Sequence, residues 1–122
     1  MYGETSADFA GADRTDVPGY LDFDVSVIEG DGLTTVRVSG DLDCYSAPRL
    51  RATLWTLVAD GPRRVVLEIG GTNFIDSTGL GVLVGGVRRF RQGGGDMVLR
   101  APSATARRLF EITGVTKLFE IV

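Results

Sequence analysis

Apolar and polar residues alternate in two short stretches near the start of the chain. The alternation covers residues 23–27 and residues 36–39, and Gly30-Asp31-Gly32 lies between the two stretches. A two-residue period is typical of strands with one buried face, and this central triplet tolerates the positive φ angles of a tight turn. The pattern therefore predicts a β-hairpin whose first strand begins near Leu21.

Three later segments have apolar residues at the three-and-four spacing of an α-helix. The first follows Ser46, which we expect to cap it, and ends before Gly61-Pro62. The second covers about residues 77–92. The third begins after Ser103 and ends at Gly114, a residue type that commonly terminates helices.

Short apolar runs at residues 65–69, 97–99 and 118–122 separate or follow these helices. Nearly continuous apolar runs are typical of strands that are covered on both sides or paired in parallel. The element order is then β-β-α-β-α-β-α-β. It predicts a single α/β domain in which a mixed sheet opens with a hairpin and packs with about three helices.

The first 19 residues lack any such period. They are rich in small and acidic residues, so we expect residues 1–19 to be a flexible extension and residues 20–122 to form the domain. No apolar run is long enough to cross a membrane, and the start of the chain lacks the layout of a signal peptide. These features predict a soluble, cytoplasmic protein without a membrane partner.

Composition narrows the chemistry. The chain has no histidine, so a Ser-His-Asp triad is impossible, and its single cysteine, Cys44, cannot form a thiolate cage for zinc. The formal net charge of −3 does not favour nucleic acid as a partner. Residues 1–43 nevertheless carry 10 acidic residues and 2 arginines, and the remainder is basic. An acidic tail beside ordinary solvated helix faces explains this asymmetry, and a binding device is the alternative.

The stretch from Asn73 to Leu83 places polar residues where a strand-to-helix loop becomes a helix. In the simpler interpretation, Asp76 or Ser77 is only the N-cap. In the other, Ser77 is modified, because free N–H groups and the helix dipole at this position would favour a phosphate.

Other phosphate-binding and nucleophilic motifs do not fit this stretch. A P-loop needs a lysine, but the only one in the chain is Lys117, and the third glycine of a dinucleotide fingerprint is replaced by Val84. The first glycine of a hydrolase elbow is replaced by Ile75. Without a histidine base, Ser77 is not expected to act as a nucleophile.

Glycines in the predicted 77–92 helix need a physical reason. Gly85 and Gly86 together should cost about 2 kcal/mol relative to alanine. Close packing of the helix on the sheet is one explanation, and close approach of a partner's backbone is the other. We interpret Arg88, Arg89 and Arg91 as a solvated face.

Two motifs in this order resemble a known family. Gly40-Asp41-Leu42-Asp43 with Ala47-Pro48-Arg49-Leu50, and then Phe74-Ile75-Asp76-Ser77-Thr78-Gly79-Leu80-Gly81-Val82-Leu83, closely resemble the anti-sigma factor antagonists of the STAS domain family. Leu109-Phe110 and Thr113-Gly114 also match the family. The resemblance covers residues 20–122.

The resemblance implies a partner-switching protein rather than an enzyme, with no cofactor. In this family the unphosphorylated antagonist binds an anti-sigma factor, usually a serine kinase, and a sigma factor is released. Phosphorylation at the position of Ser77 breaks the complex, and a PP2C-type phosphatase restores it. The resemblance assigns the partner surface to Asp41, Asp43, Asp76, Thr78, Gly79, Leu80 and Gly81.

Two departures and two rival functions stay open. Asp41 replaces the family's usual glutamate, and many members continue past the last strand into a further helix. One rival is a STAS module that senses a nucleotide or lipid and is never phosphorylated. The other is an enzyme that uses Asp41, Asp43 and Asp76 as acid, base or metal ligands.

Overall fold

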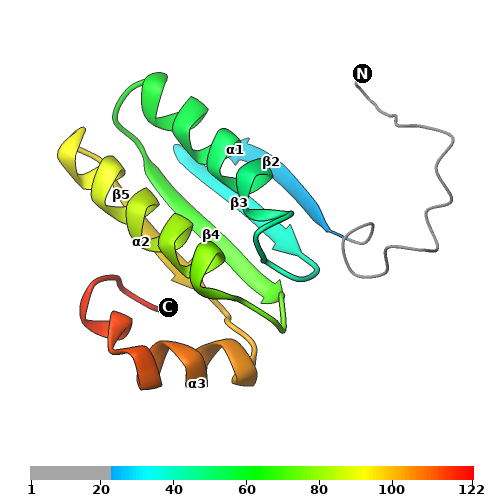
Figure 1. Cartoon of the computed structure of the whole chain (residues 1–122). Helices are drawn as coiled ribbons and strands as arrows, with labels where there is room; N and C mark the ends of the chain where they lie inside the picture. Colours follow the sequence, from blue (N-terminus) through cyan, green and yellow to red (C-terminus); the bar gives the residue numbers. More distant parts are fainter. Residues whose placement is uncertain (1–22) are drawn as a thin grey trace, which may run out of the picture.

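Four strands form one mixed sheet in residues 23–122, the part of the chain that the computed structural model describes (Figure 1). The expected extension over residues 1–19 lies outside the described residues. The sheet has the order β2 (Asp24–Gly30), β3 (Leu33–Ser39), β4 (Arg64–Gly71), β5 (Asp96–Arg100). Strands β2 and β3 are antiparallel, and β3, β4 and β5 are parallel, so the predicted mixed sheet with an opening hairpin is confirmed.

The hairpin turn has the backbone that the sequence predicts. Asp31 and Gly32 have φ angles of 54° and 72°, the two consecutive positive values of a tight two-residue hairpin turn.

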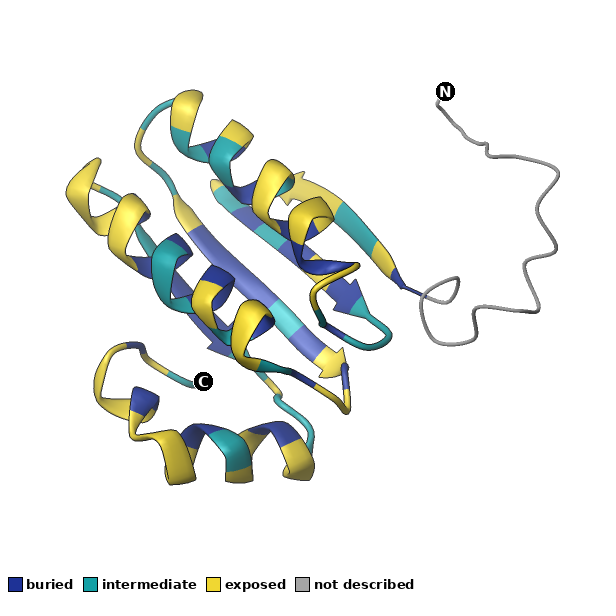
Figure 2. Cartoon of the chain, viewed as in Figure 1, coloured by how far each residue is buried: buried dark blue, intermediate teal, exposed yellow. Residues whose placement is uncertain are grey.

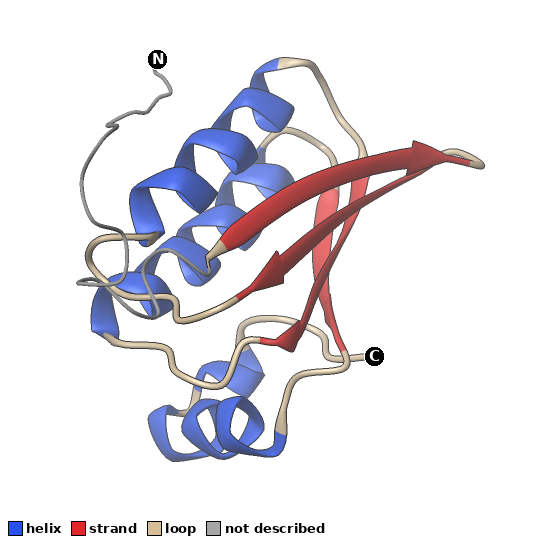
Figure 3. Ribbon diagram, turned by 90° about the vertical axis from the view of Figure 1, so that its right-hand side faces the viewer, coloured by secondary structure: helices blue, strands red, loops and turns tan. Residues whose placement is uncertain are grey.

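Two helices cover one face of this sheet. They are α1 (Ala47–Ala59) and α2 (Ser77–Gln92), which lie side by side in Figure 1. The third, α3 (Ala104–Thr113), lies past the ends to which the parallel strands point, and no helix covers the opposite face of the sheet in the described residues (Figure 3). The predicted number of helices is confirmed, and α2 has the predicted bounds.

The core lies between the sheet and this helix pair, and Figure 2 shows that buried residues concentrate there. The apolar stripes of both helices point inward because their residues recur at the helical period. The fully buried large side chains of this core include Val36, Val38, Leu50, Leu54, Val65, Leu67, Ile69, Leu83, Met97 and Leu99. A second contact holds α3 to the chain's last residues, because the Phe110 and Phe119 rings meet edge to face at 5.4 Å.

The predicted last strand over residues 118–122 is wrong. After α3 the chain forms a short 3-10 turn, η2 (Val115–Lys117), and only Ile121 makes an isolated parallel bridge, to Leu99 of β5. The physical reason is that the Leu118 N–H bonds back to the Val115 carbonyl at 2.8 Å, so the chain is still turning there. Pairing with β5 is confined to the last residues, where the Leu99 N–H donates to the Glu120 carbonyl and the Val122 N–H to the Leu99 carbonyl.

The uncovered face of the sheet carries an ion-pair ladder. Arg37 donates to Glu68 at 2.7 Å, and Arg100 lies 3.5 Å from the same carboxylate. The hydrogen bond from Arg37, with the charges of both arginines, lowers the pKa of Glu68 below its usual value. Val66 and Val98 lie on the same face beside this ladder and are buried. Within the described residues, the helices are too short and too polar for a transmembrane span.

Candidate functional site

The site is built where two loops run side by side. Residues 40–46 lead from β3 into α1, and residues 72–76 lead from β4 into α2. The Leu42 N–H donates to the Phe74 carbonyl at 2.8 Å, and the Asp76 N–H donates to the Leu42 carbonyl at 3.1 Å. These bonds continue the parallel pairing of β3 and β4 past the ends of both strands, so the starts of α1 and α2 are held together.

Asp76 connects the two helix starts through one carboxylate. Its Oδ1 accepts from the Gly79 N–H at 2.9 Å, which makes Asp76 the N-cap of α2. Its Oδ2 accepts from the Cys44 N–H of the neighbouring loop at 3.1 Å. Of the two N-cap residues that the sequence left open, the structure selects Asp76, and Ser77 becomes the first helical residue.

The other acidic loop is ordered by a local network around Ser46. The Asp43 Oδ1 accepts from the backbone N–H groups of Tyr45 and Ser46 at 2.9 and 3.0 Å. Ser46 occupies the N-cap position of α1, as predicted, but its hydroxyl makes no capping bond. The buried hydroxyl instead donates to the Asp41 carbonyl at 2.6 Å, because the helical φ and ψ of Ser46 direct it back toward the loop.

Ser77 and Thr78 are exposed on the first turn of α2. In the part of the chain that the structure describes, neither hydroxyl has a hydrogen-bond partner, and neither backbone N–H is bonded. Asp76 accounts for the next two N–H groups, those of Gly79 and Leu80. The turn therefore presents two free backbone donors and an accessible serine hydroxyl at the positive end of the α2 dipole.

The glycines of α2 have different surroundings. A Cβ on buried Gly79 would lie 2.6 Å from the Leu42 carbonyl oxygen, and one on Gly86 would lie 3.1 Å from Leu54 and Met97 atoms. Close packing explains both residues. A Cβ on exposed Gly81 would meet nothing within 4 Å, so packing within the chain does not explain this glycine. Leu80, which lies between Gly79 and Gly81 in the sequence, is half-buried against the core.

The three loop aspartates do not form a metal site in the described residues, which contain no group of three His, Cys, Asp or Glu side chains able to hold an ion. Oxygens of Asp43 and Asp76 accept backbone N–H groups instead. Both carboxylates thus act as hydrogen-bond acceptors that order the loops and the start of α2.

Two exposed aromatic residues border the site and were missed at the sequence level. Tyr45 is 72% exposed on one loop, and Phe74 is 52% exposed on the other. The sequence did contain a signal for them, because each polar loop has an aromatic residue in or beside a motif that resembles the family. A groove between α1 and α2 was also missed, because it combines residues from both helices.

Comparison with known proteins identifies this fold. Residues 24–122 match the family model of the STAS domain. The chain belongs to the STAS domain family. Among its relatives, the anti-sigma-B factor antagonist of Staphylococcus aureus is 31% identical over 101 residues, which cover 83% of this chain and 94% of the relative. The protein of the same name from Staphylococcus epidermidis is 30% identical over the same length.

Solved structures agree with the family assignment. An anti-sigma factor antagonist from Mycobacterium paratuberculosis matches with a TM-score of 0.73 and 29% identity, over 81% of this chain and 84% of that one. The anti-sigma factor antagonist SpoIIAA matches at 24% identity in unphosphorylated form, with a TM-score of 0.67, and the phosphorylated Bacillus protein matches with 0.63. Each covers 82% of this chain, and 87% and 90% of the respective SpoIIAA chains. The predicted single STAS fold is confirmed.

Proposed function

We propose that this protein is an anti-sigma factor antagonist whose binding is switched off by phosphorylation of Ser77. The observation that carries the proposal is the exposed Ser77 hydroxyl beside two unbonded N–H groups, within the motif that matches the family. The names of the relatives support the antagonist role. The unphosphorylated protein would bind a cytoplasmic anti-sigma factor and thereby release a sigma factor.

The switch is a reversible phosphoryl transfer. The anti-sigma factor, acting as a serine kinase, transfers the γ-phosphoryl group of ATP to the Ser77 Oγ, the hydroxyl loses its proton, and ADP leaves. A PP2C-type phosphatase then uses water to hydrolyse the phosphate ester, which restores the serine and releases inorganic phosphate. In this cycle the antagonist is a substrate and a binding partner, and it catalyses no reaction itself.

The local geometry explains why the phosphate would act across the interface. The dianion suits the N-terminal end of α2, so the fold tolerates it. A bound partner, however, would have to accommodate the added bulk and charge beside the Asp76 carboxylate. A penalty of about 3 to 5 kcal/mol would weaken binding by a factor of several hundred to several thousand.

The partner surface of the proposal is the ridge formed by the two joined loops and the first turns of α2. It contains Asp41, Asp43, Asp76, Thr78, Gly79, Leu80 and Gly81. Gly79 is buried, so it would not touch the partner directly. It would contribute by packing on Leu42, which keeps α2 close to the first loop. The exposed rings of Tyr45 and Phe74 enlarge this surface.

The proposal is tested by titrating the purified full-length protein with each anti-sigma factor serine kinase of its host, by calorimetry, and by following phosphate incorporation in parallel. We expect one kinase to bind the unphosphorylated protein and to modify it, and we expect Ser77→Ala to bind without accepting phosphate. Thr78→Ala is the comparison for the site alone: it removes the neighbouring hydroxyl, and phosphate should still be incorporated at Ser77 even if this change in the partner surface weakens binding.

Two outcomes would contradict the proposal in different ways. Phosphate incorporation into Ser77→Ala at the wild-type rate would refute the site. Equal affinity of the kinase for the phosphorylated and unphosphorylated wild-type protein would refute the switch.

A further inference from the structure

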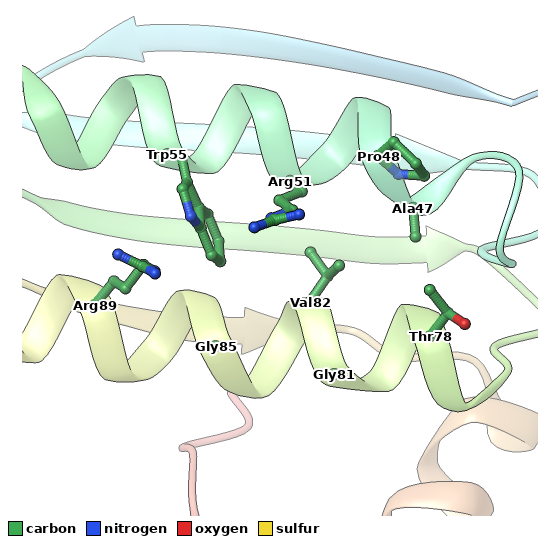
Figure 4. A pocket seen from close by; sticks show the side chains of 9 residues that line it. All are labelled: Ala47, Pro48, Arg51, Trp55, Thr78, Gly81, Val82, Gly85 and Arg89. Atoms are coloured by element: carbon green, nitrogen blue, oxygen red, sulfur yellow. The ribbon is translucent and has the colours of Figure 1, made fainter.

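A groove of about 350 Å³ lies between α1 and α2 and opens to the surface (Figure 4). Trp55 of α1 stands between two arginines: the Arg51 guanidinium lies 5.5 Å from the indole centroid, and the Arg89 guanidinium from α2 lies 4.7 Å from it. Both arginines are exposed, and neither has a carboxylate partner among residues 23–122. The groove therefore presents two unneutralised cations held in place by one aromatic ring.

The rest of the groove is small and apolar. Pro48 and Val82 contribute aliphatic surface, Thr78 adds a hydroxyl at one end, and Gly81 and Gly85 leave two positions of the α2 wall without side chains (Figure 4). Gly85 is explained by its neighbour, because a Cβ there would lie 3.3 Å from the Trp55 ring. Gly81 has no such neighbour, although glycine in a helix costs about 1 kcal/mol relative to alanine. Its backbone therefore borders open space within the groove.

We propose that this groove binds an acidic helical segment of the anti-sigma factor. Carboxylates of the segment would pair with Arg51 and Arg89 on either side of Trp55, and an apolar side chain beyond the Arg51 contact would lie against Gly81 (Figure 4). This inference rests on the proposed function and assigns it a second contact area. The charge of the groove favours this occupant, and Thr78 connects the groove with the phosphorylation turn, since it lines the groove one residue after Ser77.

The arginine spacing limits the geometry of the segment. The two centroid distances place the guanidiniums at most about 10 Å apart. Carboxylates on one face of a helix, one or two turns apart, are separated by about 5 to 11 Å along its axis and match this span. Two guanidiniums can also bind carboxylates with paired N–H donors, which adds directional specificity to the charge attraction.

The test uses the kinase that binds the wild-type full-length protein in the calorimetric titration above. The Arg51→Gln/Arg89→Gln double variant should bind it at least tenfold more weakly, with a smaller dependence of the Kd on salt concentration. The matched control is Arg107→Gln/Arg108→Gln, which removes the same charge from exposed positions on α3 and should bind within twofold of wild type.

Gly81→Ala separates binding from folding. The added methyl group should raise the melting temperature, because it favours the helix and meets nothing in the domain, yet it should weaken binding at least fivefold.

Since Trp55 is the only tryptophan in the chain, incorporation of 5-fluorotryptophan gives one fluorine resonance for the groove. It should shift when unlabelled kinase is added.

The outcomes distinguish this inference from the proposed function. If no anti-sigma factor binds the wild-type protein, both fail. If one binds and the groove double variant matches wild type within twofold, only the groove inference fails. A resonance that moves with protein concentration alone would instead assign the groove to a second copy of the chain. A resonance that moves when Glu4, Asp8, Asp13 and Asp16 are neutralised would assign it to the chain's own acidic segment, and either result overturns the proposal.

Discussion

The two oxygens of Asp76 have separate tasks, since one caps α2 and the other binds the Cys44 N–H of the neighbouring loop. Asp76→Ala removes both bonds. It should lower the free energy of unfolding by about 1 to 3 kcal/mol, the combined scale of an N-cap and one further hydrogen bond. Urea denaturation followed by circular dichroism measures this loss.

The control for that prediction is Asp24→Ala, because Asp24 is exposed and its side chain makes no hydrogen bond or ion pair within the described residues. This variant should stay within about 0.5 kcal/mol of wild type. If Asp76→Ala lowers the free energy of unfolding no more than Asp24→Ala does, the two hydrogen bonds of Asp76 do not stabilise the fold.

Gly79 and Gly81, two residues apart in one helix, should respond oppositely to alanine. Gly81→Ala should stabilise the protein by about 1 kcal/mol, because helix propensity improves and the methyl group has open space. Gly79→Ala should destabilise it by about 1 to 3 kcal/mol, because the methyl group would overlap the Leu42 carbonyl and side chain. Denaturant midpoints of the pair decide this, and shifts of the same sign would contradict the packing described for α2.

At the scale of single elements, the ladder on the open face of the sheet predicts a pH dependence. Arg37 holds the pKa of Glu68 below its usual value, so the folded state favours the carboxylate. This contribution is complete above the pKa of the unfolded chain and is lost as pH falls through the lower folded pKa. Glu68→Gln should therefore reduce stability slightly at pH 7, and the difference should shrink by pH 3.

Arg37→Gln tests the same ion-pair ladder independently, because it removes the main cause of the lowered pKa of Glu68. The urea midpoint of this variant should also lie further below that of the wild-type protein at pH 7 than at pH 3. A deficit that grows toward acid pH in both variants would rule out this account.

Elements with local signals could be predicted from sequence. Ser103 and Gly114 bound α3 as expected: the Ser103 hydroxyl accepts from the Ala106 N–H, and Gly114 has the left-handed φ of a C-cap. The strand predicted over residues 118–122 was wrong, because an apolar segment does not indicate how much of it will pair with a strand edge, and here only Ile121 forms a bridge. The pairing of Leu42 with Phe74 and Asp76 was also hidden, since it depends on two loops meeting in space.

At the scale of the whole molecule, Ser77 could be placed at a helix start by pattern, and its proposed role as phosphoacceptor came from the family resemblance. The groove could not be found in this way. Arg89 was interpreted as part of a solvated face, and its position over Trp55 emerges only when α1 and α2 pack side by side. Sites made by one segment leave a sequence signal, whereas sites shared by two helices leave none until the fold is known.

Phosphorylation should leave the fold of the whole molecule intact. The phosphate adds a charge of about −2 at the positive end of the α2 dipole, where an anion is favourable by about 0.3 to 1 kcal/mol. The melting temperature of the protein modified at Ser77 should equal or slightly exceed that of the unmodified protein in scanning calorimetry. A decrease of more than about 5 °C would show that the modification acts by disturbing the domain.

The bonded pair of loops also restricts how this protein can vary. Loops are usually where related chains gain and lose residues. Here an insertion before Leu42 or before Phe74 would slide one loop past the other and break the bonds that position α2. The lengths of both loops are thus locked together. Variation at the site is left to the outward side chains, such as Tyr45 and Phe74, so new partner preferences would arise by substitution rather than by insertion.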